Sequence, residues 1–466
     1  MLLSLLGIST VLISCGGEDN ASPTNSAPGD HVQHKQAVAE FVRTELAMLE
    51  NLDCHASNSS SACDTVIVDF ATEARPARES RSEQVILIID DQGLEFPAVS
   101  RYRSRVLQAV RLNNTTGLYE HYSPQVVMPR FVRDLFTHID TFAGSDNQPT
   151  FIPAVWLRQL SQGVSNINSD FSDIYAVNHG DMPFLYLLEH NPEARFVIAQ
   201  TPTFFTAFKA EFCAADSSAL RAKIATAAAM FKDNVLDQYG VRYVSYSGGF
   251  SLATLRNRWT SLCQTLIPEA SLPALLDALR PFYEVLFNTE GVMGFQASGI
   301  NMSIEEYPLD TDVHFHNRVR VGDYTNLDSQ LPEDGVIGHR EPPALIASRQ
   351  NSRRWIDLLI NFGIEPVRPW QPNQTALAET NILGLDSYPI TSIQPSWATP
   401  VALSQAIYIK NIQYPDDPLT DAVIIAIKDQ LTPMGCTFYP EDEGRCKVQD
   451  PLLHRQQELF RLNYID

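Results

Sequence analysis

Apolar runs of strand length alternate with helix-like stretches through the middle of this chain, and this alternation is the strongest constraint on its fold. The helix-like stretches carry apolar residues at three- and four-residue spacing. Strands separated by helices predict a mainly parallel sheet with right-handed crossovers, and therefore an α/β fold. The predicted strands are 85–89, 196–199, 241–246, 291–297 and 318–321, and the predicted helices are 219–236, 272–286 and 400–412.

Three short segments supply an acid, a base and a nucleophile. Asp90 and Asp91 end the first apolar run, His179 follows much later, and Ser396 opens a helix-like stretch. A Ser hydroxyl is a weak nucleophile at neutral pH and needs a base within hydrogen-bond reach. An unperturbed His, with a pKa of about 6.5, suits that role. Taken singly, each residue also has an ordinary structural explanation as a turn, loop or N-cap residue.

The residues around the three segments extend this pattern. The order Asp, His, Ser is the order in subtilisin. The first apolar run leads into Asp91-Gln92-Gly93, and Ser396 begins the sequence Ser-Trp-Ala-Thr-Pro. His179-Gly180 is followed by Asn-Pro-Glu-Ala and an apolar run at 191–199. In these features the chain resembles the subtilisin-like serine proteases, the subtilases.

The resemblance implies a subtilisin-like three-layer α/β fold, with a mainly parallel central sheet flanked by helices. It also implies a serine endopeptidase that cleaves peptide bonds in proteins or peptides through an acyl-enzyme. In this reading Ser396 is the nucleophile, His179 the general base and Asp91 the acid that orients His179. Asp91 keeps the Asp-x-Gly spacing of the family, and Asp90 is the alternative.

The resemblance also suggests residues for the substrate cleft and the oxyanion hole. Asn301 is the candidate oxyanion donor, one residue later than the family's Ala-Gly-Asn would place it, and Gln394-Pro395 stands where the family has Gly-Thr. These departures leave open an alternative, a catalytically impaired protein of the same fold that binds a peptide or partner. The candidate cleft residues are Ser245, Ser247, Gly248 and Gly249.

A second cluster suggests a different chemistry. The residues Asp310, Asp312, His314 and His316 alternate along the chain. On a strand they would place four metal ligands on one face, which would favour a metal site or a metal-dependent hydrolase. The other interpretation is a solvated loop or edge strand. The serine mechanism itself requires no cofactor, and the resemblance allows a structural calcium ion, although no segment defines its ligands.

The amino-terminal segment indicates where the protein works. The apolar run at 2–13 is shorter than the roughly 20 residues of a membrane-spanning helix, and it ends in Leu12-Ile13-Ser14-Cys15. This tetrapeptide resembles the bacterial lipobox, which implies a signal peptide at 1–14 and a lipid on Cys15. A polar tether at 15–29 would then hold the protein to a membrane of the bacterial cell envelope. The alternative is an ordinary secretory signal with an incidental Cys.

Beyond the tether, we expect an accessory segment at 30–75 and a peptidase domain with insertions at 80–466. If Cys15 is lipidated, an even number of Cys remains, which suits disulfides in an oxidising compartment. Close spacing suggests the pairs Cys54/Cys63 and Cys436/Cys446, which leaves Cys213 with Cys263. Other connectivities stay open.

The charge of the chain excludes one class of partner. The formal net charge is −21. Binding to phosphate backbones requires a basic surface, so nucleic acid is not an expected partner. The expected partners are a protein or peptide substrate and, through the lipid, a membrane.

Overall fold

The computed structural model describes residues 63–67, 84–90, 103–129, 179–191, 193–298, 302–324, 355–361 and 395–431. The chain divides into two compact units, Met1–Met48 and Leu49–Asp466, and every described residue belongs to the second. The predicted signal peptide and the tether after Cys15 therefore lie outside the described residues.

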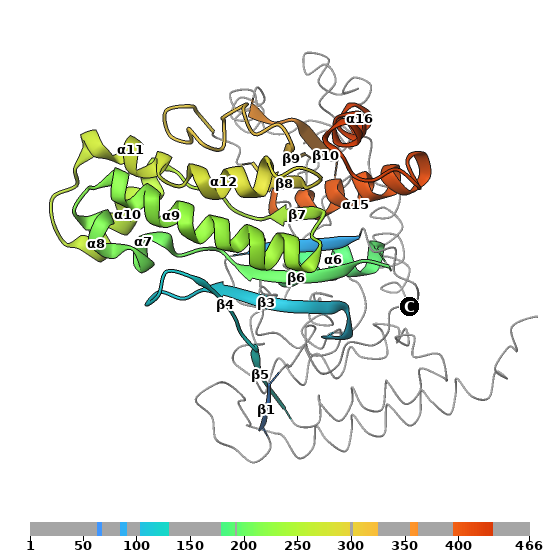
Figure 1. Ribbon diagram of the computed structural model, residues 1–466, viewed down its shortest axis with the longest axis horizontal. Coiled ribbons are helices and arrows are strands. Elements are labelled where there is room, and N and C mark those ends of the chain that lie inside the picture. Colours follow the sequence, from blue (N-terminus) through green and yellow to red (C-terminus); the bar gives the residue numbers. More distant parts are fainter. Residues whose placement is uncertain are drawn as a thin grey trace, which may run out of the picture. The chain divides into compact units, whose positions relative to one another are not determined.

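A mostly parallel sheet forms the centre of the described structure (Figure 1). Its eight strands run in the order β10-β9-β8-β7-β2-β6-β3-β4. All neighbours are parallel except β3 and β4. The alternating pattern thus correctly predicted an α/β fold. The strands are β2 (Val85–Asp90), β3 (Val106–Leu112), β4 (Tyr119–His121), β6 (Arg195–Gln200), β7 (Tyr243–Tyr246), β8 (Met293–Ala297), β9 (Arg318–Tyr324) and β10 (Leu358–Asn361).

The strand order reverses around β2. After β2 the chain adds β3 and β6 on one side, then crosses to build β7, β8, β9 and β10 on the other. In open parallel sheets, ligand sites lie outside the carboxyl ends of the strands at such a reversal. The carboxyl end of β2, between β6 and β7, is therefore the first place to look for a site.

Helices cover both faces of this sheet. In Figure 1, α9 and α12 lie in front of the strands, whereas α15 packs on the other face against β7, β8, β9 and β10, and also against α6 and α16. The helices of the first group are α7 (Phe204–Ala207), α8 (Lys209–Cys213), α9 (Ser217–Phe231), α10 (Leu252–Cys263), α11 (Leu272–Asp277) and α12 (Arg280–Phe287). Those of the second group are α6 (Asp181–His190), α15 (Pro395–Gln413) and α16 (Asp421–Leu431). Three short helical turns are η1 (Arg103–Arg105), η2 (Lys232–Asp237) and η3 (Glu269–Ser271).

The central strand β2 has two different faces. All six of its residues are buried, and Val85, Leu87 and Ile89 join the aromatic-rich core formed with α9 and α12. Full burial of each such side chain contributes about 1.5–3 kcal/mol. Because side chains alternate along a strand, Ile88 and Asp90 point to the opposite face, which α6 and α15 cover.

Two predicted helices have different limits in the structure. The stretch 272–286 forms two helices, α11 and α12, and Pro281 lies in the first turn of α12, where its missing N–H is tolerated. The helix predicted at 400–412 begins five residues earlier, at Pro395. Ser396 is therefore inside the first turn of α15 instead of preceding the helix.

One disulfide joins the ends of two helices. Cys213 at the end of α8 is bonded to Cys263 at the end of α10, with an S–S distance of 1.94 Å. This is the pair left over in the sequence argument. Cys54, Cys436 and Cys446 lie outside the described residues.

A separate two-stranded sheet joins two regions that are distant in sequence. Strand β1 (Cys63–Ile67) pairs antiparallel with β5 (Gln125–Pro129). The predicted accessory segment at 30–75 therefore contributes a strand that pairs with a strand of the region 80–466.

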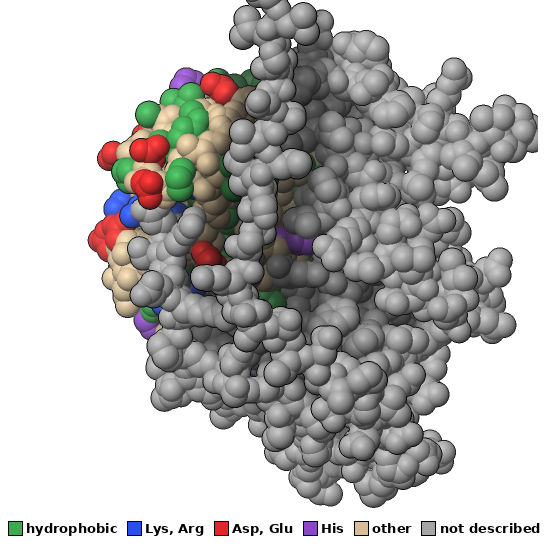
Figure 2. Space-filling view, turned by 90° about the vertical axis from the view of Figure 1, so that its right-hand side faces the viewer, with side chains coloured by type: hydrophobic (Ala, Val, Ile, Leu, Met, Phe, Trp, Pro, Cys, Tyr) green, Lys and Arg blue, Asp and Glu red, His purple; other side chains and the backbone are tan. Residues whose placement is uncertain are grey.

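The described surface is chemically mixed. On the face drawn in Figure 2, acidic side chains lie next to hydrophobic ones. The most exposed large hydrophobic side chains are Leu266, Ile304, Val313, Tyr408, Ile412 and Ile425. Within the described part of the chain, no helix combines the length and apolar character needed to cross a bilayer.

Candidate active site

A buried carboxylate contacts a half-buried imidazole at the carboxyl end of β2. Nδ1 of His179 lies 2.9 Å from Oδ1 and 3.0 Å from Oδ2 of Asp90. The side chain of Asp90 is 2% exposed and that of His179 is 27% exposed. A carboxylate accepts hydrogen bonds, so Nδ1 carries the shared proton and Nε2 lies on the other edge of the ring. This tautomer is the one in which Nε2 can act as a general base.

Helix α6 holds His179 in this position. His179 and Gly180 come directly before the helix, and Phe184 and Leu187 anchor it through fully buried side chains. At the other end of α6, Asn191 Nδ2 donates to Ser404 Oγ of α15 over 2.9 Å. The two helices that carry the predicted base and nucleophile are therefore fixed to each other.

The first turn of α15 lies beside the imidazole. The ring centroids of Trp397 and His179 are 6.3 Å apart, and Ser396 is the residue before Trp397. Ser396 is half-buried. The structure thus gathers Asp90, His179 and the turn that carries Ser396 at one end of the sheet.

The start of α15 favours negative charge. The first N–H groups of a helix have no partner within the helix, and the helix dipole is positive at this end. Ser396 is the second residue of α15, so its N–H is one of these groups. Thr399 Oγ1 donates to the carbonyl oxygen of Pro395 over 2.8 Å and stabilises the turn. An anion that forms next to Ser396 would meet backbone donors that have no partner within the helix.

The predicted cleft residues continue from the neighbouring strand β7. Ser247 N–H donates to the carbonyl oxygen of Ile89 over 3.1 Å, which places Ser247 next to the end of β2. Ser245 is fully buried, and Ser247 is 9% exposed. Neither hydroxyl has a hydrogen-bond partner within the described structure. Alternation along β7 puts both on the same sheet face as Asp90.

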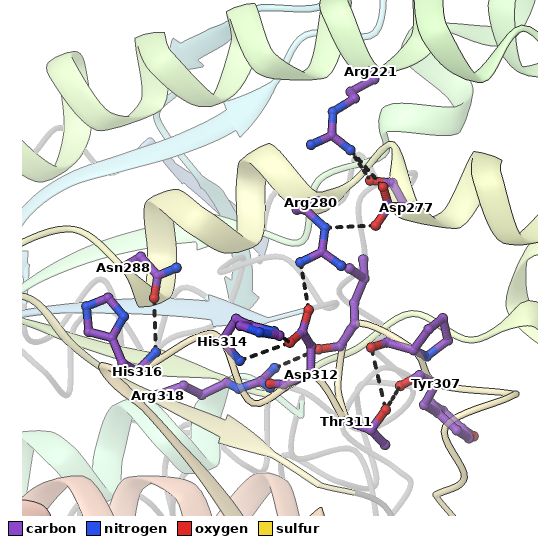
Figure 3. Close-up of polar contacts among 12 residues, drawn as sticks. Arg221, Asp277, Arg280, Asn288, Tyr307, Thr311, Asp312, His314, His316 and Arg318 are labelled. Carbon is purple, nitrogen blue, oxygen red and sulfur yellow. Dashed lines mark hydrogen bonds and ion pairs between the residues drawn. The ribbon is translucent and has the colours of Figure 1, made fainter.

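The residues of the predicted metal cluster do not share a face. Residues 310–316 form turns, not a strand, so the alternation in sequence does not bring the four side chains together, although Asp312 and His314 contact each other at 2.6 Å. Asp310 accepts hydrogen bonds from Tyr283 and Gln296, and His316 Nε2 lies 3.8 Å from Asp421. Figure 3 shows the imidazoles of His314 and His316 with different neighbours. Among the residues that the structure describes, no three His, Cys, Asp or Glu side chains are close enough to hold a metal ion.

Asp312 belongs instead to a series of ion pairs with residues of the helices α9, α11 and α12 (Figure 3). Arg280 Nη1 lies 2.6 Å from Asp312 and Arg280 Nε lies 2.8 Å from Asp277, which in turn pairs with Arg221 at 2.7 Å. Burial raises the pKa of Asp312, but hydrogen bonds from the His314 N–H and from Arg280 outweigh it and bring the pKa to about 2. These ion pairs tie the turns around Asp312 to α11 and α12.

Of the predicted site residues, Asp91, Asn301 and Cys15 lie outside the described residues.

Some contacts of the described residues were not anticipated from the sequence. Trp397 was part of the Ser motif but had no predicted role, and Gln296 was not singled out. A Gln inside the apolar strand Met293–Ala297 was the available signal, because a polar side chain in a buried strand needs a partner.

No protein-family model, curated protein or solved structure matches this chain. The described residues establish its class as an α/β fold with a mostly parallel sheet. At the reversal point of that sheet, they establish an Asp–His pair beside the amino end of a helix that carries a Ser. Any assignment of activity rests on these residues and their geometry.

Proposed function

We propose that this protein is a serine endopeptidase with a subtilisin-like three-layer fold. The observation that carries the proposal is the contact of His179 Nδ1 with both carboxylate oxygens of Asp90, next to the turn of α15 that holds Ser396. The strand order supports it, since the pair lies where open α/β sheets place their ligands. The order of the three residues along the chain agrees with the subtilase resemblance.

The proposed reaction follows from these groups. Ser396 Oγ attacks the carbonyl carbon of a peptide bond while His179 Nε2 takes the hydroxyl proton. The same proton passes to the leaving amine as the C–N bond breaks, which leaves an ester on Ser396. Water, deprotonated by His179, then hydrolyses the ester. Asp90 holds the imidazole tautomer and stabilises the imidazolium; its contact with His179 favours it over Asp91 for this role.

The negative oxygen of the tetrahedral intermediate needs hydrogen-bond donors. In the proposed site one donor is the N–H of Ser396 at the start of α15. The second is the side chain of Asn301, which rests on the sequence resemblance alone. Loss of one such donor typically costs about 3–4 kcal/mol of transition-state stabilisation.

Labelling with a fluorophosphonate probe tests the proposal. The purified protein beginning after Cys15 is compared with Ser396→Ala, His179→Ala and a control, Ser261→Ala, which removes an exposed hydroxyl on α10. We expect the wild type and the control to be labelled, and labelling to fall by about 10³-fold or more in the other two variants. A folded wild-type protein that does not react would overturn the proposal. Direct binding of peptides to that protein would then support the catalytically impaired alternative.

We also propose that the enzyme is lipid-anchored at Cys15 to a membrane of the bacterial cell envelope, on its periplasmic or surface side. The lipobox-like sequence before Cys15 supports this location. The Cys213–Cys263 disulfide is of a kind that persists in oxidising compartments. Incorporation of a labelled fatty acid and recovery in the membrane fraction are expected for the wild type and should both be lost in Cys15→Ser. Equal labelling of both proteins would contradict the anchor.

A further inference from the structure

A second buried acid, Asp310, packs against the segment that follows β7. Asp310 is 4% exposed. Its Oδ1 accepts hydrogen bonds from Tyr283 Oη and from Gln296 Nε2, both over 2.7 Å. A carboxylate removed from water is costly unless such donors satisfy it. Its partners come from α12 and β8, so the carboxylate is held from two elements.

The backbone of residues 248–250 lies directly against this carboxylate. A Cβ on Gly249 would overlap Oδ2 of Asp310 and would lie 3.0 Å from its Cγ. Only glycine allows this approach. The backbone N–H of the next residue, Phe250, lies close enough to this carboxyl group to lower its pKa.

Gln296 connects Asp310 to residues 248–250 through its side-chain amide. Its Nε2 also donates to the carbonyl oxygen of Gly248 over 3.0 Å, and its Oε1 accepts from Arg318 Nη1 over 3.0 Å. Arg318 is itself 2% exposed and lies over the rings of Phe287 and Phe315. Because both ends of the Gln296 amide are occupied, its orientation is fixed.

We propose that Asp310 and Gln296 are positioning residues that hold the backbone of residues 248–250 in the conformation that binds substrate. This inference rests on the proposed function, in which Gly248 and Gly249 line the cleft. Two successive glycines lose more backbone freedom on ordering than other residues. The close contact of Asp310 with Gly249 and the hydrogen bond from Gln296 to Gly248 restrict that freedom from inside the protein.

The experiment compares Asp310→Asn with Asp312→Asn. The control removes a carboxylate two residues away that contacts Arg280 and His314. Amide hydrogen exchange is measured on the peptide that covers residues 243–252 in the protein beginning after Cys15. Hydrolysis of a library of internally quenched peptides gives KM and kcat, and fluorophosphonate labelling reports on Ser396 alone. A milder variant, Tyr283→Phe, removes only one donor to Asp310.

In Asp310→Asn we expect exchange at residues 248–250 to rise at least tenfold. We also expect KM to rise several-fold, with a smaller change in kcat and in the labelling rate. Tyr283→Phe should change the same quantities less, and Asp312→Asn should leave exchange at 248–250 unchanged. Unchanged exchange in Asp310→Asn and Tyr283→Phe, or faster exchange with an unchanged KM, would overturn the inference. A wild-type protein that neither labels nor cleaves would overturn the proposed function, and exchange would still decide whether Asp310 holds this segment.

Discussion

Two buried aspartates lie near the carboxyl ends of strands in the same sheet, and their surroundings differ in one decisive respect. Asp90 contacts an imidazole that is 27% exposed. Asp310 is enclosed by a buried phenol, a buried amide and the backbone of Gly249. A carboxylate that contacts a partly exposed titratable ring can act on a bound substrate through that ring. A carboxylate whose donors are an amide and a phenol with a pKa raised by burial fixes the positions of its neighbours.

The two faces of the sheet explain this difference. Asp90 points toward α6 and α15; His179 lies directly before α6, and α15 carries Ser396. On β8, a Cβ at Gly294 would meet Phe287 of α12, so alternation places Gln296 on the α12 face. That face is covered by aromatic side chains such as Tyr283 and Phe287. The polar groups there are sealed from water, which suits a structural role and not proton transfer.

Replacing Asp90 should give the largest effect. In Asp90→Asn the amide donates to Nδ1 and favours the wrong imidazole tautomer, so we expect the rate of fluorophosphonate labelling to fall by about 10³- to 10⁴-fold. The unfolding transition should change little. The matched control is Asp91→Asn, which alters the neighbouring residue of the Asp-x-Gly motif. A large loss in Asp91→Asn together with normal labelling of Asp90→Asn would assign the role to Asp91.

Removing Arg318 should instead affect mainly the stability of the fold. Arg318→Met leaves Gln296 Oε1 and the carbonyl oxygen of Leu309 without their donor. Breaking a buried charged network of this kind is expected to lower the free energy of unfolding by about 3–5 kcal/mol. Labelling per folded molecule should be preserved, because the Asp90–His179 contact lies on the other face.

Urea unfolding measures this loss, and Arg111→Met is the control. Arg111 forms an exposed ion pair with Glu120, with side chains 49% and 34% exposed. Such pairs contribute at most about 1 kcal/mol. If both variants lost the same small free energy of unfolding, the hydrogen bonds of Arg318 would not contribute strongly to stability.

Five of the eight strands of the sheet, β2, β6, β7, β8 and β9, were predicted because apolar residues recur along them, whereas β3, β4 and β10 were not predicted. Val85–Asp90 has six buried residues, and the predicted strand covered five of them. The position of Ser396 at the start of a helix was also predictable, since it begins a helix-like pattern, whereas the helix that follows His179 was not predicted. In the predicted elements, local composition and tertiary burial favour the same secondary structure.

The choice between Asp90 and Asp91 could not be made from sequence. Both carry the same side chain, and spacing to Gly93 favoured Asp91. The pleat of β2 decides which residue faces α6, and that depends on the register with β6 and β7. The alternation from Asp310 to His316 was misleading for a similar reason. Turns can carry alternating polar residues without the extended backbone that would align them.

Asp312 should give a moderate effect that depends on pH. Its pKa in the folded protein, about 2, lies below the usual value of 3.8. The folded state therefore favours the charged form, and the stabilisation is fully present above pH 3.8 and is lost as the pH falls toward 2. At neutral pH, Asp312→Asn should lower the free energy of unfolding by about 1 kcal/mol, because the ion pair with Arg280 is partly screened by solvent. A difference that persists at the lowest pH would contradict this explanation.

Asp310 should show the opposite pH dependence and the smallest effect. Burial raises its pKa above 3.8, although Tyr283, Arg318, Gln296 and the Phe250 N–H partly offset the shift. Between 3.8 and the raised value the folded state binds more protons than the unfolded state, so this group makes stability fall as pH rises through that window.

Comparing wild type with Asp310→Asn by urea unfolding from acid to neutral pH isolates this contribution. The expected difference in the free energy of unfolding between wild type and Asp310→Asn declines with rising pH and becomes constant above the pKa of Asp310 in the folded protein. This is the reverse of the expectation for Asp312. A slope of the same sign as that of Asp312 would mean that the folded state favours the Asp310 anion. Residues 248–250 would then be held mainly by its charge. The expected slope would mean that the packing and hydrogen bonds of Asp310 hold residues 248–250, even though its charge is costly to bury.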